Sequence, residues 1–264
     1  MNDNLMGSII DKSSNDEYKA VVDVEGGNAI DRIEIIKNGI VEHTYVHNGK
    51  WEKDELSGKV RFKFELELGW GPDIRVYPDI TEKKWTGKVM TEGKIISVEK
   101  LWTSPGQKIT KQEENAVEFD ITTRKGGVGS GKLSQKNHAT PYIQTQSMIF
   151  EIEADIDSKI TVIIDDKEYQ YTVSEILKET HLIGLIDEAK ELSKERFGIS
   201  EFYRSDPFWH NAYKIKIHKG VPYKAYKVAL DYVVKGTEKD MDYVMVKVHQ
   251  KNGEKAWASP IWIK

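Results

Sequence analysis

The sequence predicts a mainly β protein, an antiparallel β-sandwich with one helical segment at about residues 174–197. Asn-Gly pairs separate runs of apolar and β-branched residues, a pattern typical of tight hairpins because both turn residues need a positive φ. Residues 60–68 alternate apolar and charged side chains, as in a strand with one buried face. Many short strand-like segments and a single helical one favour a sandwich with a helix at its edge.

The first half of the chain consists of expected strands. They cover residues 18–24, 32–36, 40–46, 60–68, 85–90, 94–100 and 116–123. Asn-Gly pairs at 38–39 and 48–49 lie close together and predict a three-stranded meander. In the segment 60–68 the apolar face is expected in the core and the charged face in solvent. The apolar face comprises Val60, Phe62, Phe64, Leu66 and Leu68, and the charged face Arg61, Lys63, Glu65 and Glu67.

The second half repeats the pattern around one helical segment. Its expected strands cover residues 146–152, 159–164, 168–173, 213–218 and 227–234. Residues 174–197 have helical apolar spacing, with Ser174 as the expected N-cap and Gly198 as the stop, although Gly184 could divide the segment into two helices. The chain closes with a hairpin around Asn252-Gly253 that ties residues 255–264 into a sheet.

We expect residues 1–264 to form one sandwich unit with a helical insertion. The alternative is two packed β subdomains, residues 1–125 and 141–264, separated by a Gly-, Ser-, Lys- and Asn-rich segment. That segment, residues 125–141, is expected to be a surface loop, with a mobile lid as the other interpretation.

Composition restricts the classes of partner. A net charge of −4 and a pI of about 6.0 argue against a nucleic-acid or anionic-membrane partner. The absence of cysteine excludes disulfides and thiolate chemistry. No run approaches the roughly 20 apolar residues of a membrane helix, and residues 1–11 do not resemble a signal peptide. We therefore expect a soluble protein, cytoplasmic by default.

No motif predicts catalysis. Gly126, Gly131 and Lys132 fit the spacing of a P-loop, but Leu133 stands where magnesium needs Ser or Thr, and no helical pattern follows. His43 and His47 lie on an expected strand, where four residues span about 13 Å, too far for one metal. The sequence therefore predicts a chain that is not an enzyme, with no catalytic, cofactor-binding or metal-ligating residue and no cofactor.

The seven tryptophans of the chain are the remaining candidates for ligand or partner recognition. Such rings stack on sugars in carbohydrate-binding modules, but they also fill cores and anchor interfaces. The last strand carries apolar residues on both faces, which predicts burial on both sides by a helix or a partner. The candidate ligand or interface residues are Trp70, Trp85, Trp102, Trp209, Trp257 and Trp262.

The C-terminal sequence carries a family likeness. Residues 243–263, with Ala256-Trp257-Ala258-Ser259-Pro260-Ile261-Trp262, resemble the end of large bacterial proteins that contain a PHP-type (polymerase and histidinol phosphatase) metal-dependent hydrolase domain. Those proteins carry Arg at the position of Lys247 and Ser at that of Ala258. Further agreement in order extends over residues 5–8, 32–39, 67–71, 85–89, 92–98 and 145–152.

The resemblance implies a β-rich accessory region without the catalytic domain, because the metal-binding clusters of such proteins precede this region. The chain is then either an excised fragment or a stand-alone relative that keeps only the accessory module. Our first hypothesis is a non-catalytic module that packs on a hydrolase domain, or on a partner in the same protein, and helps to bind its substrate. The alternatives are a carbohydrate-binding module that uses surface Trp and Tyr for a glycan, and a stand-alone metal-dependent hydrolase built from scattered His and Asp.

Overall fold

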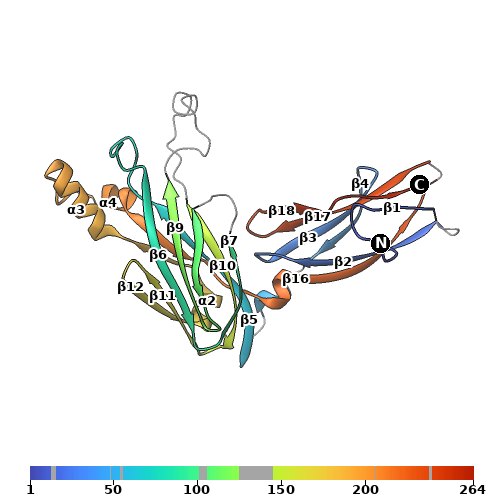
Figure 1. Cartoon of the computed structure of the whole chain (residues 1–264), viewed down its shortest axis with the longest axis horizontal. Helices are drawn as coiled ribbons and strands as arrows, with labels where there is room; N and C mark the ends of the chain where they lie inside the picture. Colours follow the sequence, from blue (N-terminus) through green and yellow to red (C-terminus); the bar gives the residue numbers. More distant parts are fainter. Residues whose placement is uncertain are drawn as a thin grey trace. The chain divides into compact units, whose positions relative to one another are not determined.

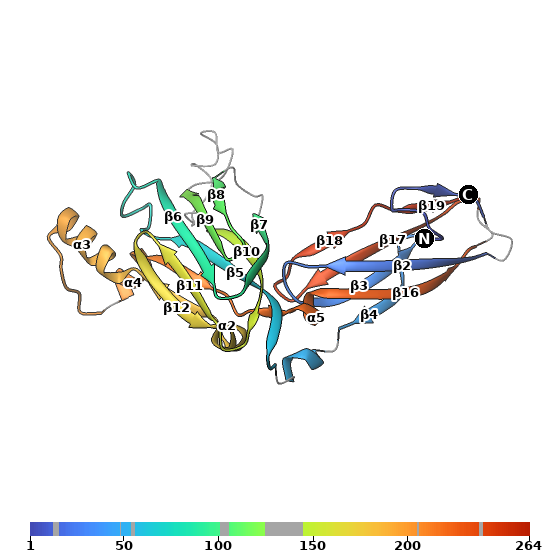
Figure 2. The same cartoon turned by 60° about the horizontal axis from the view of Figure 1, so that its bottom comes forward.

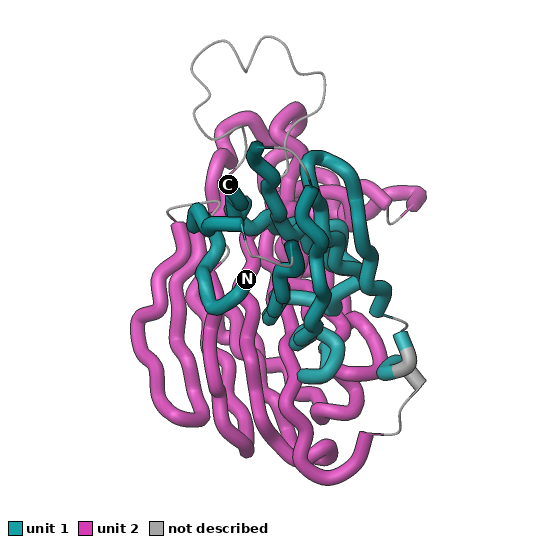
Figure 3. The backbone as a smooth tube through the Cα atoms, turned by 90° about the vertical axis from the view of Figure 1, so that its right-hand side faces the viewer, with its two compact units in different colours: residues 1–55, 221–264 teal, residues 56–220 magenta. Residues whose placement is uncertain are grey.

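The computed structural model describes residues 1–12, 16–47, 49–53, 56–100, 106–124, 145–204, 206–237 and 240–264 (Figure 1). Within these ranges the protein is mainly β and is built from several antiparallel sheets, which confirms the predicted fold class. The chain forms two compact units, a terminal unit of residues 1–55 and 221–264 and a central unit of residues 56–220 (Figure 3). No helix in the described ranges is both long and apolar enough to span a lipid bilayer.

This grouping differs from both arrangements expected from the sequence, because the two ends of the chain pair with each other. Strand β2 pairs along its whole length with β16, and β3 pairs with β17, so the last 44 residues associate with the first 55. The boundary expected at residues 125–141 falls within the central unit, and that segment lies outside the described residues.

The central unit contains two sheets with the strand orders β13-β14-β5-β10-β7 and β12-β11-β6-β9-β8 (Figures 1 and 2). Their neighbouring strands are antiparallel, and one apolar core draws side chains from both sheets, as in a sandwich. The strands of the first sheet are β5 (Lys59–Trp70), β7 (Lys94–Lys100), β10 (Gln146–Asp155), β13 (His181–Gly184) and β14 (Tyr213–Ile217). Those of the second are β6 (Glu82–Thr91), β8 (Gln107–Gln112), β9 (Ala116–Arg124), β11 (Lys159–Ile164) and β12 (Lys167–Thr172).

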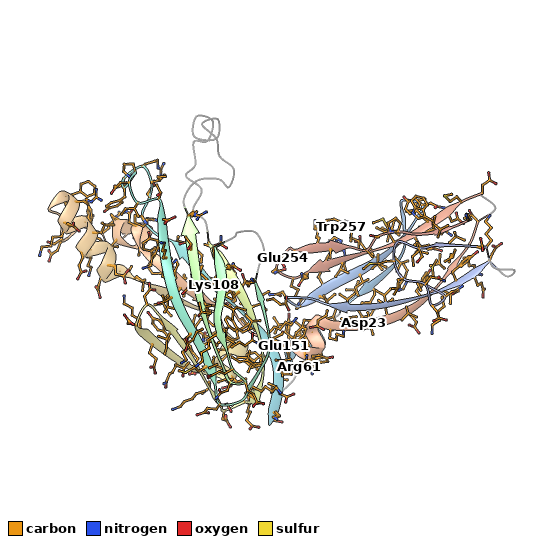
Figure 4. All side chains as sticks on the ribbon, viewed as in Figure 1. Asp23, Arg61, Lys108, Glu151, Glu254 and Trp257 are labelled. Carbon is orange, nitrogen blue, oxygen red and sulfur yellow. The ribbon has the colours of Figure 1, made fainter. Side chains whose placement is uncertain are left out.

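Strand β5 confirms the alternation predicted for residues 60–68 on its apolar face but not on its charged face. Val60, Phe62, Phe64, Leu66 and Leu68 are all buried. On the opposite face Lys63 is only 2% exposed, and its Nζ lies 2.7 Å from a carboxylate oxygen of Glu99 on β7. Arg61 likewise contacts the buried Glu151 of β10 at 2.7 Å (Figure 4). The neighbouring strands supply opposite charges, so this face is an ion-paired surface rather than a fully solvated one.

The prediction of one helical segment at residues 174–197 is wrong at residues 181–184, which form a strand. The segment comprises α2 (Val173–Lys178), strand β13 and α3 (Ile186–Phe197), because residues 181–184 pair with β14. The N-cap is Thr172 rather than Ser174: its hydroxyl accepts a hydrogen bond from the Glu175 amide, and the Glu175 carboxylate accepts one from the Thr172 amide. Gly198 ends α3 with a φ of 69°, as predicted. A further short helix, α4 (Asp206–Asn211), precedes β14.

The terminal unit is a second, smaller pair of sheets. One sheet has the order β1-β19-β17-β3-β4, with β18 also on β17, and the other pairs β16 with β2. Aliphatic side chains of both sheets, among them Ile35, Val234, Val244 and Ile263, form one core cluster. Its strands are β1 (Ile9–Ile10), β2 (Glu17–Glu25), β3 (Ile30–Lys37), β4 (Ile40–Val46), β16 (Lys227–Lys235), β17 (Asp242–Gln250), β18 (Lys255–Trp257) and β19 (Ile261–Ile263). A short strand β15 (Val221–Pro222) and helix α5 (Tyr223–Tyr226) lead into β16.

Two of the three Asn-Gly turns form the predicted hairpins. Asn38 and Gly39 have φ values of 50° and 83° and connect β3 to β4, while Gly253 has a φ of 91° between β17 and β18. Among the described residues no third strand of the expected meander directly follows Gly49: a 3-10 helix, η1 (Lys50–Lys53), occurs there, and the next strand, β5, belongs to the central unit. Its first turn closes through a hydrogen bond from the Glu52 amide to the Gly49 carbonyl, so the chain coils rather than extends.

Candidate functional site

Trp85, one of the candidate ligand residues, is part of the core. Its side chain is buried, and its indole Nε1 donates a hydrogen bond to the Thr123 hydroxyl at 2.9 Å. The Tyr213 ring meets it edge-on with centroids 5.4 Å apart, and burial raises the pKa of Tyr213 to about 12. The Lys83 ammonium lies 4.4 Å from the Trp85 ring centre. Every face of this indole has a protein partner, so Trp85 supports the sandwich instead of a ligand.

Trp70 and Trp209 are also held by the central unit. Trp70 ends β5 in a half-buried position with a φ of 57°. Trp209 lies on α4 against Gly184, where an added Cβ would come within 2.5 Å of the indole. Lys214 donates to the Trp209 carbonyl at 2.8 Å and its Nζ lies 4.9 Å from the ring centre. Burial lowers the pKa of Lys214. The remaining candidate in this unit, Trp102, lies outside the described residues.

No helix of the described residues covers the outer face of the last strand, so the predicted burial by a helix is wrong, whereas burial by a partner stays a prediction. Ile261 and Ile263 of β19 enter the core, whereas Trp262 is exposed and packs on Tyr243 with ring centroids 5.2 Å apart. Trp257 on β18 is 58% exposed (Figure 4). Because side chains alternate along β19, the Trp262 side chain points away from the core. Within the described residues, no element of this unit covers it.

A groove of about 490 Å³ lies beside Trp257, entirely within the terminal unit. Its walls are the side chains of Ala20, Val22 and Val24 from β2 and of Val244, Val246 and Val248 from β17. Strand β18 and residues 1–6 complete it. Val246 and Val248 pair with Ile35 and Ile33 of β3, both of which are buried. The valines of β17 therefore lie on the inner face of their sheet. The groove is therefore an opening into the apolar interior of the sandwich.

The rim of this groove is apolar as well. Leu5 is 82%, Met6 66% and Val21 62% exposed, and Trp257 stands on the same rim. Isolated exposed apolar residues are common, whereas several around one hollow make that hollow a candidate binding surface. We define the docking groove as this hollow with its four rim residues, Leu5, Met6, Val21 and Trp257.

Strand β2 presents unpaired backbone groups next to the docking groove. The amide and carbonyl of Lys19 bond to Asn2, on the side away from β16. Successive residues of a strand direct these groups to opposite edges, so those of Val21 and Asp23 also point away from β16. Among the described residues, no strand pairs with β2 on that side. The edge thus offers hydrogen-bonding groups to an extended segment of another chain.

Two charged residues of β2, Asp23 and Glu25, also line the docking groove. Asp23 contacts Lys227 at 3.0 Å, and Lys19 contacts Asp231 at 2.7 Å. The hydrogen bond and charge of Asp231 raise the pKa of Lys19 against the small effect of its desolvation. These pairs tie β2 to β16, and the ion pairs of Asp23 and Glu25 with Lys227 place partnered charges at the edge of an otherwise mainly apolar groove.

The histidines singled out in the sequence do not gather into one site. His43 stacks on Tyr232 with ring centroids 4.4 Å apart, while His47 Nε2 lies 3.1 Å from the Lys224 carbonyl. His181 stacks on Tyr171 at 4.0 Å. The P-loop-like residues 126–133 lie outside the described ranges. No sequence pattern indicated the docking groove, because its rim residues are of the same apolar types as core residues and differ from them only in exposure.

Comparison with known proteins adds no name to this site. The chain matches no protein-family model, no curated protein and no solved structure. The class that the fold and the docking groove define is therefore a two-unit, mainly β protein with an open apolar surface beside a free strand edge.

Proposed function

We propose that this chain is a non-catalytic accessory module that docks a partner domain through the groove of its terminal unit. The main support for this proposal is the edge of β2 with which no described strand pairs. This edge lies beside an apolar hollow, and the Val21 side chain next to both is 62% exposed. The resemblance of residues 243–263 to the end of PHP-type proteins suggests a metal-dependent hydrolase domain as the partner. Packing on that domain would also let the module help to bind its substrate.

The apolar rim supplies the affinity in this proposal. Full burial of a Val, Leu, Met or Trp side chain contributes on the order of 1.5–3 kcal/mol before the losses of association are subtracted. The docking groove offers four such side chains around one hollow, so a partner of modest area could bind in the micromolar range. Trp257 is the expected anchor, since aromatic residues dominate binding energy at interfaces.

The free edge supplies direction and register. An extended segment of the partner would bond to the amide groups of Val21 and Asp23 and place alternate apolar side chains into the hollow. The ion pair of Asp23 with Lys227 holds β2 on β16, which keeps the edge straight for pairing. This mode requires a partner segment with apolar residues at every second position.

The test is association with a separately expressed PHP-type hydrolase domain, followed by calorimetry and by the thermal midpoint of each protein. Val21→Pro removes one edge N–H from an exposed position and should weaken binding about tenfold or more. Trp257→Ala should do the same by removing the anchor. Val21→Lys, which puts a charge on the apolar rim, should also weaken binding. Val41→Lys, on the exposed strand β4, is its matched control and should leave binding unchanged.

Absence of association and of any change in midpoint would contradict the proposal. Association that survives Val21→Pro, Val21→Lys and Trp257→Ala would place the partner elsewhere on the chain. Binding to a polysaccharide that disappears in Trp257→Ala would favour the carbohydrate-binding alternative instead, because Trp257 is the most exposed of the described tryptophans.

A further inference from the structure

Three ligating side chains meet on the outer face of the central unit, away from the core. Glu65 and Glu67 are two apart on β5 and so share one face of the sheet. His218 follows β14, whose Lys216 lies opposite Glu67, and the His218 amide donates to the Glu65 carbonyl at 2.9 Å. One ligand atom from each of the three side chains lies within 4.8 Å of the other two.

Glu67 and His218 are in direct contact. His218 Nε2 lies 2.7 Å from Glu67 Oε2. The site therefore presents a negative oxygen donor next to an imidazole nitrogen.

Glu65 is the third member of the cluster. Its side chain is half-buried, and within the described residues its carboxylate has no hydrogen-bond or ion-pair partner. Most other carboxylates on this face of the sheet are paired, as Glu99 is with Lys63 and Glu151 with Arg61. A half-buried carboxylate directed at a His–Glu pair and without a cation of its own is the arrangement that a metal ion would complete.

We propose that Glu65, Glu67 and His218 bind a single divalent transition-metal ion of the Zn²⁺ class. Zinc binds imidazole nitrogen and carboxylate oxygen at about 2.0–2.2 Å, so ligand atoms around a tetrahedral ion lie about 3.4 Å apart. Small side-chain rotations bring atoms that are within 4.8 Å to that spacing. Imidazole beside two carboxylates suits zinc or a neighbouring first-row ion and not calcium, which prefers oxygen ligands alone.

Three protein ligands leave one position of a tetrahedral ion for water. Lys216 opposes the ion, because its Nζ lies 4.0 Å from Glu67 Oε2 and competes for the same carboxylate. The lysine is partly exposed and can turn into solvent when the ion enters. Its presence predicts micromolar rather than nanomolar affinity, and it provides a variant that should strengthen binding.

The test is titration of the whole chain, without a histidine tag and after dialysis against a chelator, with Zn²⁺ alone in a calorimeter. We expect one ion per chain. His218→Asn and Glu65→Gln should each weaken binding at least tenfold, and Lys216→Met should tighten it. His210→Asn, an exposed histidine of α4 in the same unit, is the matched control and should bind as the unaltered chain does.

A second readout separates ligation from loss of folding. Co²⁺ in a site with four ligands absorbs strongly in the visible range, and this band should appear with the unaltered chain and vanish in His218→Asn. Circular dichroism of each variant should match that of the unaltered chain. Failure to bind Zn²⁺, or binding that is equal in all variants, would overturn the site and leave Glu67 and His218 as a hydrogen-bonded pair only.

Discussion

Asn38 and Asp242 lie 204 residues apart in sequence, yet the Asn38 amide nitrogen donates to the Asp242 carboxylate at 2.7 Å. The Asn38 side-chain oxygen also accepts a hydrogen bond from the Tyr243 amide at 3.0 Å. The turn between β3 and β4 is thereby fastened to the first residues of β17. One amide side chain joins the two ends of the chain within the terminal unit.

Replacement of Asp242 should destabilise the terminal unit. The residue is fully buried, and its carboxylate also accepts from the Thr237 hydroxyl at 2.6 Å and the Thr237 amide at 2.7 Å. Asp242→Ala leaves these half-buried donors without an acceptor, at a cost of about 2–3 kcal/mol. Urea unfolding should show the loss, whereas Asp231→Ala, at an exposed ion pair, should change stability by under about 1 kcal/mol. Equal effects of the two would contradict this role.

The same carboxylate predicts a dependence of stability on pH. Burial disfavours its charge, but the hydrogen bonds from Thr237 and Asn38 and the charge of Lys37 outweigh this and hold the pKa of Asp242 below its ordinary value. A lowered folded-state pKa contributes stability above the unfolded pKa of about 3.9, and this is lost as the pH falls through the folded pKa. The difference in unfolding free energy between the unaltered chain and Asp242→Asn should therefore narrow below about pH 4. A constant difference from pH 7 to pH 3 would refute it.

Gly87 on β6 should not tolerate a side chain. An added Cβ would lie 2.2 Å from ring carbons of Phe119, which is buried in the core opposite it on β9. Because that ring also packs on Phe150, it cannot move freely, and Gly87→Ala should cost about 1–3 kcal/mol. Thermal unfolding would measure the loss, with Lys84→Ala at an exposed position of the same strand as the control.

Trp85 should matter for stability and not for binding. Trp85→Phe keeps an aromatic ring but removes the donor to Thr123 and leaves a cavity, which predicts a loss of about 2–4 kcal/mol. The affinity for a partner of the docking groove should stay unchanged, since Trp85 belongs to the central unit. If the folded Trp85→Phe variant bound the partner more weakly, Trp85 would be a ligand-contacting residue.

Local patterns predicted the parts of the fold that local contacts determine. The alternation of residues 60–68 specified the buried face of β5, and the Asn-Gly pair at 38–39 specified its hairpin, because side-chain period and turn geometry act over a few residues. The helix prediction was wrong at residues 181–184. The apolar spacing there is compatible with a helix or a strand, and pairing with β14 makes it a strand.

The candidate sites were beyond such patterns. Trp85 and Trp257 look alike in the sequence, and only the packing of the sheets buries one and exposes the other. Glu65 and Glu67 can be recognised as neighbours on one strand face, but their proximity to His218 depends on the register of β14 on β5. The free edge of β2 follows from its pairing with β16, some 200 residues away, for which no local signal exists.

The division of the chain has a consequence for its synthesis. Residues 56–220 are contiguous, so the central unit can complete both sheets while the ribosome is still adding β16 to β19. Strands β2 and β3 emerge before the central unit, but their partners β16 and β17 emerge after it. During that interval their apolar faces stay uncovered, and the pairing that finally encloses them is among the most non-local in the molecule. Strands β2 and β3 are thus made before the central unit yet are enclosed after it, and the terminal unit is where slow folding and premature association should concentrate.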